Sequence, residues 1–177
     1  MKTPLLLLAL PLLAIGCASP SPRTTHPLAR EVMRPGTEPE YFKVSDNDAA
    51  MMAAVRQARR NLPTFVDALQ HPAKGQRKFE VKKPFIKDAM VEHIWLSDVT
   101  YSGGRFHGRV DNHPRLITGV KMGDRVSVNP NEITDWAFVD KGQLMGGYTI
   151  RELVNELPAD RRAAFEKEAE FHIAGNP

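Results

Sequence analysis

The chain has 177 residues, of which 42% are hydrophobic and 25% are charged. These values are ordinary for a globular protein, and they exclude wholesale disorder, a collagen-like fibre and a polytopic membrane protein. Lys and Arg number 24 against 21 Asp and Glu, and a net charge of only +3 gives no case for nucleic-acid binding. The single cysteine excludes an internal disulfide and a zinc site built from cysteines.

The N-terminus has the pattern of a secretory signal. Lys2 precedes an apolar run, Leu5 to Ile15, that is broken only by Pro11. A helix over this run would rise about 16 Å, which is too short for a hydrocarbon core of roughly 30 Å. The run therefore indicates a signal peptide rather than a membrane span. It ends in the sequence AIGC, which closes at Cys17 and resembles the bacterial lipobox. The alternative is an ordinary secretory signal with an incidental cysteine.

The lipobox resemblance implies that residues 1–16 are removed and that Cys17 is lipidated. A thiolate is the side-chain nucleophile best suited to accept a diacylglyceryl group, and two or more acyl chains anchor a protein stably. Ala18 stands where lipoproteins kept at the inner membrane often have aspartate. We therefore expect a membrane partner through the lipid, on the periplasmic face of the outer membrane.

A proline-rich segment follows the cysteine. Residues 18–40 contain five prolines separated largely by Ser, Thr and Arg. Such a stretch cannot bury a core and stays extended, partly as polyproline II. We predict a tether over residues 17–44 and a single domain over residues 45–177.

The domain is predicted to begin with a helix. Apolar residues from Met51 to Leu69 recur at spacings of three and four, which indicates an amphipathic helix. Ser45 and Asp48 resemble a capping box at its start, and Pro63 predicts a kink or a restart in a new first turn. From Gln76 onward the hydrophobic period changes to two, which is typical of strands.

A hairpin is predicted around Gly103-Gly104, after a long strand from Val91 to Tyr101. Its expected cross-strand pairs are Tyr101 with Phe106, Thr100 with His107 and Asp98 with Arg109. Further strands are expected over 124–128, 136–139 and 143–145, with bends of the sheet at four glycines, Gly104, Gly108, Gly146 and Gly147.

The C-terminal part is predicted to be helical. Thr149 and Glu152 resemble a second capping box that opens a helix to Glu156, and Pro158 starts a last helix that runs to Ile173. The expected fold class is therefore α+β, with an N-terminal helix, a curved antiparallel sheet of five or six short strands, and C-terminal helices.

Motifs for catalysis or cofactor binding are weak. His93, His107 and His113 lie among acidic residues, but no pair has HExxH spacing, and simple alternation puts His93 and His107 on opposite faces. The chain has no GxSxG, Walker A or GxGxxG motif. We therefore expect no metal, no cofactor and no assignable catalytic residue. An envelope hydrolase that uses His93 or His107 with Asp98 or Asp111 stays open as an alternative.

Aromatic residues concentrate in the predicted sheet, and the simplest interpretation is that they form its core. The other interpretation is a ligand or partner groove with two tryptophan anchors and a polar rim. Its candidate residues are Trp95, Asp111, Asn112, Asp135, Trp136 and Tyr148.

Several motifs combine into a resemblance that covers about residues 46–156. They are Glu92-His93-Ile94-Trp95-Leu96, Gly104-x-Phe106-x-Gly108, Asp111-Asn112-x-Pro114, Gly123-Asp124-x-Val126-Ser127, Ile133-x-Asp135-Trp136 and Gly147-Tyr148-Thr149. Together with the helix that begins at Met52, they resemble a bacterial family of unknown function, the YegJ-like lipoproteins. Pro63 departs from the family pattern.

The resemblance implies a lipoprotein or secreted domain with no established reaction, so it transfers no catalytic residue. Relatives of this domain class have been associated with immunity to toxins, which implies protein binding by analogy. The leading hypothesis is a non-enzymatic, membrane-anchored module that binds an envelope protein or another envelope component. The alternatives are the hydrolase and an immunity-type inhibitor of a secreted toxin.

Overall fold

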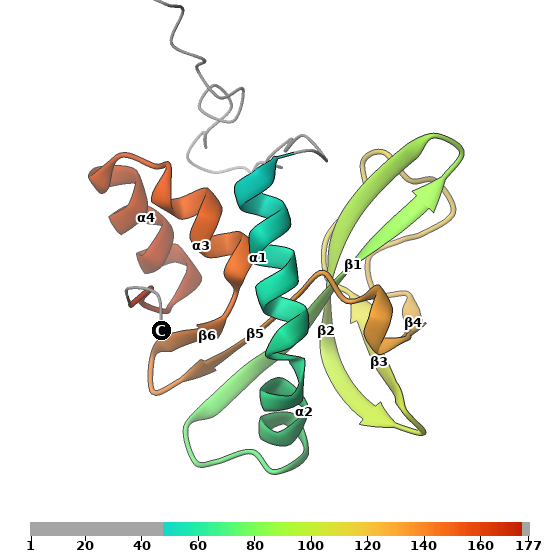
Figure 1. The fold of residues 1–177 in the computed structure, drawn as a ribbon, viewed down its shortest axis with the longest axis horizontal. Coiled ribbons are helices and arrows are strands. Elements are labelled where there is room, and N and C mark those ends of the chain that lie inside the picture. The colour runs from blue at the N-terminus through green and yellow to red at the C-terminus, as the bar shows by residue number, and fades with distance from the viewer. Residues whose placement is uncertain (1–47, 175–177) are drawn as a thin grey trace, which may run out of the picture.

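The computed structural model describes residues 48–174, which form one six-stranded antiparallel sheet with helices packed on it (Figure 1). The strand order is β4-β3-β2-β1-β5-β6. The predicted α+β class and antiparallel sheet are confirmed. The elements are α1 (Ala49–Arg60), α2 (Leu62–Gln70), β1 (Gln76–Lys87), β2 (Met90–Ser102), β3 (Arg105–Val110), β4 (Arg125–Val128), β5 (Asp135–Asp140), β6 (Gln143–Gly146), α3 (Tyr148–Asn155) and α4 (Ala159–Ala169).

Helices α1 and α2 lie across one face of the sheet (Figure 1). Asp48 caps α1, because its carboxylate accepts the backbone N–H groups of Ala50 and Met51 at 2.9 and 3.0 Å. Ser45, the residue expected to cap this helix, lies outside the described residues. Pro63 stands in the first turn of α2, so the predicted restart is confirmed.

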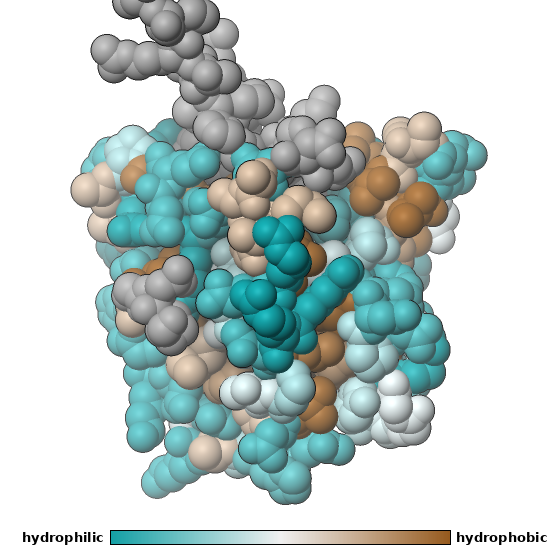
Figure 2. All heavy atoms as spheres, in the orientation of Figure 1, coloured by the Kyte–Doolittle hydropathy of each residue, from teal (hydrophilic) through white to brown (hydrophobic). Residues whose placement is uncertain are grey.

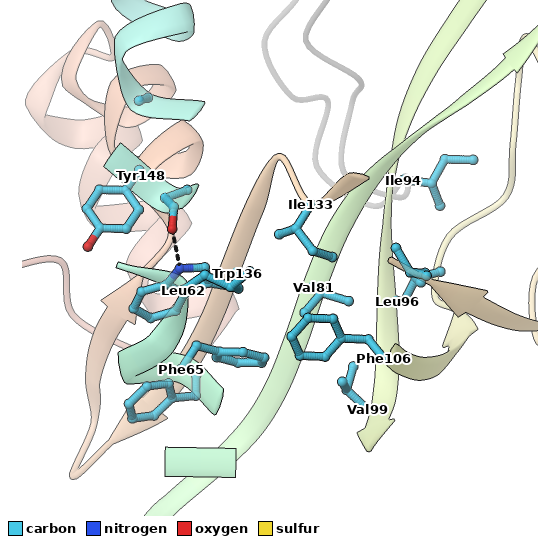
Figure 3. Packing of buried hydrophobic residues seen from close by; sticks show 14 of the residues in the cluster. Leu62, Phe65, Val81, Ile94, Leu96, Val99, Phe106, Ile133, Trp136 and Tyr148 are labelled. Carbon is cyan, nitrogen blue, oxygen red and sulfur yellow. Dashed lines mark hydrogen bonds between the residues drawn. The ribbon is translucent and has the colours of Figure 1, made fainter. Parts of the chain in front are cut away.

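The core lies between these helices and the sheet (Figure 3). Phe65 of α2 is fully buried, with its ring centroid 5.4 Å from that of Trp136 and 6.0 Å from that of Phe106. The indole N–H of Trp136 donates to the Ala58 carbonyl at 2.8 Å, which satisfies the one polar atom that this side chain brings into the core (Figure 3). The side chains of β2 alternate between the two faces of the sheet, so Ile94 is buried in the core and its two neighbours point to the other face.

The β2–β3 hairpin confirms two of the three predicted pairs, Tyr101 with Phe106 and Thr100 with His107. The third is wrong, because a β-bulge at Asp98 shifts the register and places Ser97 opposite Arg109. The Asp98 carboxylate still lies 3.7 Å from the Arg109 guanidinium. A second bulge occurs in β1 at Lys78. Both register shifts therefore lie at non-glycine residues of positive φ.

The C-terminal elements differ in detail from the prediction. Gly147, in a left-handed conformation with φ of 60°, is the N-cap of α3, and Thr149 lies inside the helix. Pro158 was expected as the first residue of the last helix and is instead the N-cap of α4, and the helix ends at Ala169 because Glu170 also adopts a left-handed conformation. The predicted end at Ile173 is therefore wrong.

The segment after α4 closes the outer edge of β6. His172 forms a parallel bridge with Gln143, its carbonyl accepts the N–H of Leu144 at 2.9 Å, and its own N–H donates to the Gly142 carbonyl at 2.8 Å. The Arg151 guanidinium donates to the carbonyls of Leu144 and Gly146 from the same side. The backbone groups that an edge strand would leave unpaired are thus satisfied within the chain.

Candidate functional site

The face of the sheet opposite α1 and α2 is the candidate site. Its central strand positions carry polar or amphipathic side chains that are exposed or half-buried. We call this surface the polar face and define it by Lys82, His93, Trp95, Ser97 and Asp111. An antiparallel sheet commonly packs one face on the core and leaves the other solvated, which accounts for the alternation.

Lys82 lies at the centre of the polar face. On β1 it pairs with Trp95 of β2 on one side and with Asp135 of β5 on the other. Its Nζ lies 5.4 Å from the centroid of the Trp95 ring, within the range of a cation–π interaction. Nζ also donates to the Thr149 hydroxyl at 3.3 Å. Burial lowers the pKa of the Lys82 ammonium, and the Asp135 charge opposes this effect.

Asp135 is fully buried and serves the backbone around it. Its carboxylate accepts the N–H groups of Trp136, Tyr148 and Thr149 at 2.8, 3.1 and 2.8 Å, and the Thr149 hydroxyl at 2.5 Å. Two of those N–H groups belong to the first turn of α3, so Asp135 caps this helix from a neighbouring strand. Burial raises the pKa of the Asp135 carboxyl, whereas Thr149 and Lys82 act against the rise.

Glu80, Ser97 and Asp111 form a second polar group next to the two bulges. The Ser97 hydroxyl donates to the Asp111 carboxylate at 2.8 Å. Burial raises the pKa of the Glu80 carboxyl to about 7, and the charge of Asp111 adds to the rise. These three side chains line a hollow of about 530 Å³ together with Lys78 and Asp98.

The six residues predicted for one surface are divided between the two sides of the sheet. Trp95 and Asp111 belong to the polar face, and the half-buried Asn112 follows Asp111 in the chain. Trp136 and Tyr148 are 2% and 7% exposed and pack edge to face in the core, with ring centroids 5.6 Å apart. The prediction that both tryptophans anchor one groove therefore needs correction. Trp136 points to the helices because its neighbour Asp135 already occupies the other side of β5.

Sequence reasoning missed Lys82, Glu80 and Glu92. The alternation of Phe79 and Val81 with charged residues was a usable signal, since it already placed Glu80 and Lys82 on the outer face. Glu92 carried no such signal. Its carboxylate is 6% exposed and accepts the backbone N–H groups of residues 115, 116 and 117 at 2.9, 2.9 and 3.1 Å, and so fixes the loop after Asp111.

The residues considered for a hydrolase have other contacts. The His93 ring nitrogen lies 3.1 Å from the Thr134 hydroxyl, Asp98 faces Arg109, and Asp111 accepts from Ser97. The bulge at Asp98 reverses the alternation of β2, so His93 and His107 lie on the same face rather than on opposite ones. Within residues 48–174, no group of three or more His, Cys, Asp or Glu side chains is placed to hold a metal ion.

Fold and site together define a small α+β domain with one face of the sheet covered by α1 and α2 and with polar side chains on the opposite face of β1 and β2. The chain belongs to a bacterial family, DUF2314, which is described as an uncharacterized protein conserved in bacteria and whose model matches residues 48–173. The resemblance to this family is thereby confirmed.

Two relatives are similar to the chain. The first, "Uncharacterized protein YegJ" of Escherichia coli (strain K12), is 34% identical over 111 residues, which cover 63% of this chain and 71% of the relative. The second is "Putative ankyrin repeat protein NMB1133/NMB1171" of Neisseria meningitidis serogroup B, 34% identical over 86 residues, or 46% of this chain and 34% of that protein. No solved structure matches the chain. None of the helices in the described residues has the length and apolar character needed to span a membrane.

Proposed function

We propose that the protein is a lipid-anchored, non-enzymatic binding module of the cell envelope, and that its polar face holds a protein or another envelope component. The observation that carries the binding role is the side of the sheet that α1 and α2 do not cover. On this side, the Trp95 ring lies against the Lys82 ammonium. His93, Ser97 and Asp111 beside it take part in hydrogen bonds.

Trp95 is suited to be the anchor of such an interface. Tryptophan offers a large, rigid contact area at a small cost in side-chain entropy, and it is enriched among residues that dominate binding energy. Its ring is half-buried and oriented by Lys82, so its conformation is largely set before a partner arrives. Asp111 and His93 are exposed on the same face and supply a polar rim.

Three charged side chains in and around the polar face are engaged in structural contacts, which favours a structural role for each of them over a catalytic one. Asp135 caps α3, Glu92 holds the loop of residues 115–117, and Lys82 contacts Thr149 and the Trp95 ring. A general acid or base needs a side chain free to reach a substrate proton, and these carboxylates are engaged with backbone N–H groups.

The anchor is supported by sequence. Cys17 lies outside the described residues, and its setting at the end of an apolar run is the basis for proposing lipidation and a place at the periplasmic face of the outer membrane. A membrane-held module needs only modest affinity, because tethering raises the local concentration of a partner in the same membrane.

Capture from detergent-solubilised envelopes tests the binding role. Trp95→Ala and the charge reversal Asp111→Arg should each reduce recovery of the bound component about tenfold or more. Met145→Ala, which changes an exposed side chain on β6, is the matched control and should bind as the wild type does. Unchanged recovery with both polar-face variants would refute the assignment of this face. The identity of the captured component distinguishes an envelope constituent from a secreted toxin.

A further inference from the structure

Exposed apolar side chains lie next to the β1–β2 turn, with Ile86 and Met90 on opposite faces of the hairpin and Leu116 on the loop that Glu92 holds beside it. Ile86 is 70% exposed, Leu116 50% and Met90 41%. We call these three residues the apolar tip. Figure 2 shows brown, hydrophobic spheres at the end of the molecule where Figure 1 places this turn. Large apolar side chains that are exposed near one projecting end of a domain indicate a site of contact with a protein or a membrane.

The apolar tip is held together by specific contacts. The buried Glu92 carboxylate accepts the backbone N–H groups of Leu116 and its two neighbours, which fixes this loop against the start of β2. From the hairpin, Lys87 Nζ donates to the carbonyl oxygen of Thr118 at 3.4 Å and to its hydroxyl. Leu116 is thus positioned at the hairpin although it follows Met90 by more than twenty residues in the chain.

Basic residues surround the apolar tip. Lys87, Arg115 and Lys121 are exposed, and Asp88 is the acidic residue in the same two segments, 86–90 and 113–122. An apolar point with a basic collar complements a lipid surface, where acyl chains lie beneath anionic phosphates. A second copy of the chain would present the same positive charge, and like charges oppose such a contact.

The apolar tip and the start of the domain lie at the same end of the molecule. In Figure 1, α1 begins at the end where the β1–β2 turn projects. Residues 18–47 connect this point to Cys17. Their fully extended reach is on the order of 100 Å, so an anchored domain can bring this end to the bilayer and meets it at high local concentration.

We propose that the apolar tip inserts into the interface of the lipid bilayer that carries the anchor, and so orients the domain on the membrane. This inference rests on the proposed lipid anchor at Cys17. Ile86 and Leu116 would enter the boundary between headgroups and acyl chains, and Lys87 and Arg115 would contact lipid phosphates.

Site-specific probes on the full-length, lipidated protein test the proposal. The anchor consumes the natural thiol, so an introduced cysteine is unique. Met90→Cys and the matched control Met145→Cys replace the same residue type at similar exposure, 41% and 38%. Each variant, labelled with an environment-sensitive fluorophore, is reconstituted into vesicles of phosphatidylethanolamine and phosphatidylglycerol. The probe at position 90 should be quenched by spin-labelled lipid and protected from iodide, with the reverse at position 145.

The outcomes separate the two proposals. Retention of the protein on the vesicles reports the anchor, whereas quenching reports the tip. A retained protein with iodide-accessible probes at both positions overturns the insertion and leaves the anchor standing. Protection from iodide without quenching by lipid also overturns it, because it assigns the apolar tip to a protein or to a second copy. Loss of retention refutes the anchor itself.

Discussion

Glu80, next to Ser97 and Asp111 of the polar face, illustrates how the protonation of one side chain is set by its surroundings. It lies on β1 beside the bulge at Lys78, where burial and the nearby Asp111 charge both favour the protonated carboxyl, whereas Lys78 opposes them. The pKa of this carboxyl rises from its ordinary value of 4.5 to about 7. The carboxyl therefore gains or loses its proton near neutral pH.

Glu80→Gln should change how stability depends on pH. Below about pH 4.5 the carboxyl is protonated in both folded and unfolded chains, so this group contributes equally to both. As the pH rises to about 7, the unfolded chain ionises first and the folded protein loses stability. The variant lacks this loss and should exceed the wild type by about 2 kcal/mol above pH 7, after allowance for partial exposure.

Urea unfolding at acidic and alkaline pH measures this difference. Glu168→Gln on the exposed surface of α4 is the control and should follow the wild type at every pH. Parallel curves for wild type and Glu80→Gln would show that the carboxyl ionises normally in the folded state.

At the scale of elements, the junction between β6 and α3 has no room for a side chain at Gly146. Gly146 has a φ of 68°, and a Cβ added there would lie 2.3 Å from the Trp136 carbonyl oxygen and 2.4 Å from the indole ring. The backbone must approach the tryptophan this closely for α3 to begin next to Asp135. A glycine thus couples the hairpin, the helix and the core.

Gly146→Ala should lower the free energy of unfolding by about 3 kcal/mol or more, because a left-handed backbone and a severe clash act together. Gly142→Ala is the matched control: its φ is 83°, but nothing lies within 4 Å of the added Cβ. It should cost only about 1 kcal/mol. Thermal or chemical unfolding of both variants checks the difference, and equal costs would mean that the chain relaxes around Gly146.

Elements were predictable where the chain itself carries the signal. Hydrophobic periodicity located both long strands, and Gly103-Gly104 marked the turn between β2 and β3. The bulge at Asp98 was not predictable, because an aspartate in a strand gives no local sign that it will adopt a positive φ. The candidate site was equally hard to predict, because its contacts join residues that are distant in the sequence. The sequence predicts Asp135 for the rim of a groove, and its role as a helix cap appears only when Tyr148, thirteen residues later, is brought to it at the start of α3.

At the scale of the whole molecule, the anchor and the domain are expected to be independent. Cys17→Ala should remove the protein from the membrane fraction while leaving its unfolding transition unchanged, because residues 48–174 contain a continuous hydrophobic core of their own. Envelope fractionation and circular dichroism measure the two effects. Persistence in the membrane fraction would place the anchor elsewhere, and a lowered transition temperature would give the N-terminal segment a structural role.

The closed edge of β6 has a consequence for crowding. With the proposed anchor, copies of the chain would share one leaflet and meet in similar orientations, and an exposed strand edge is a template for pairing with a neighbouring chain. His172 and Arg151 occupy the hydrogen-bonding groups through which such pairing would occur on this side. Arg151 and the segment around His172 thereby protect this edge of the sheet from pairing with another chain.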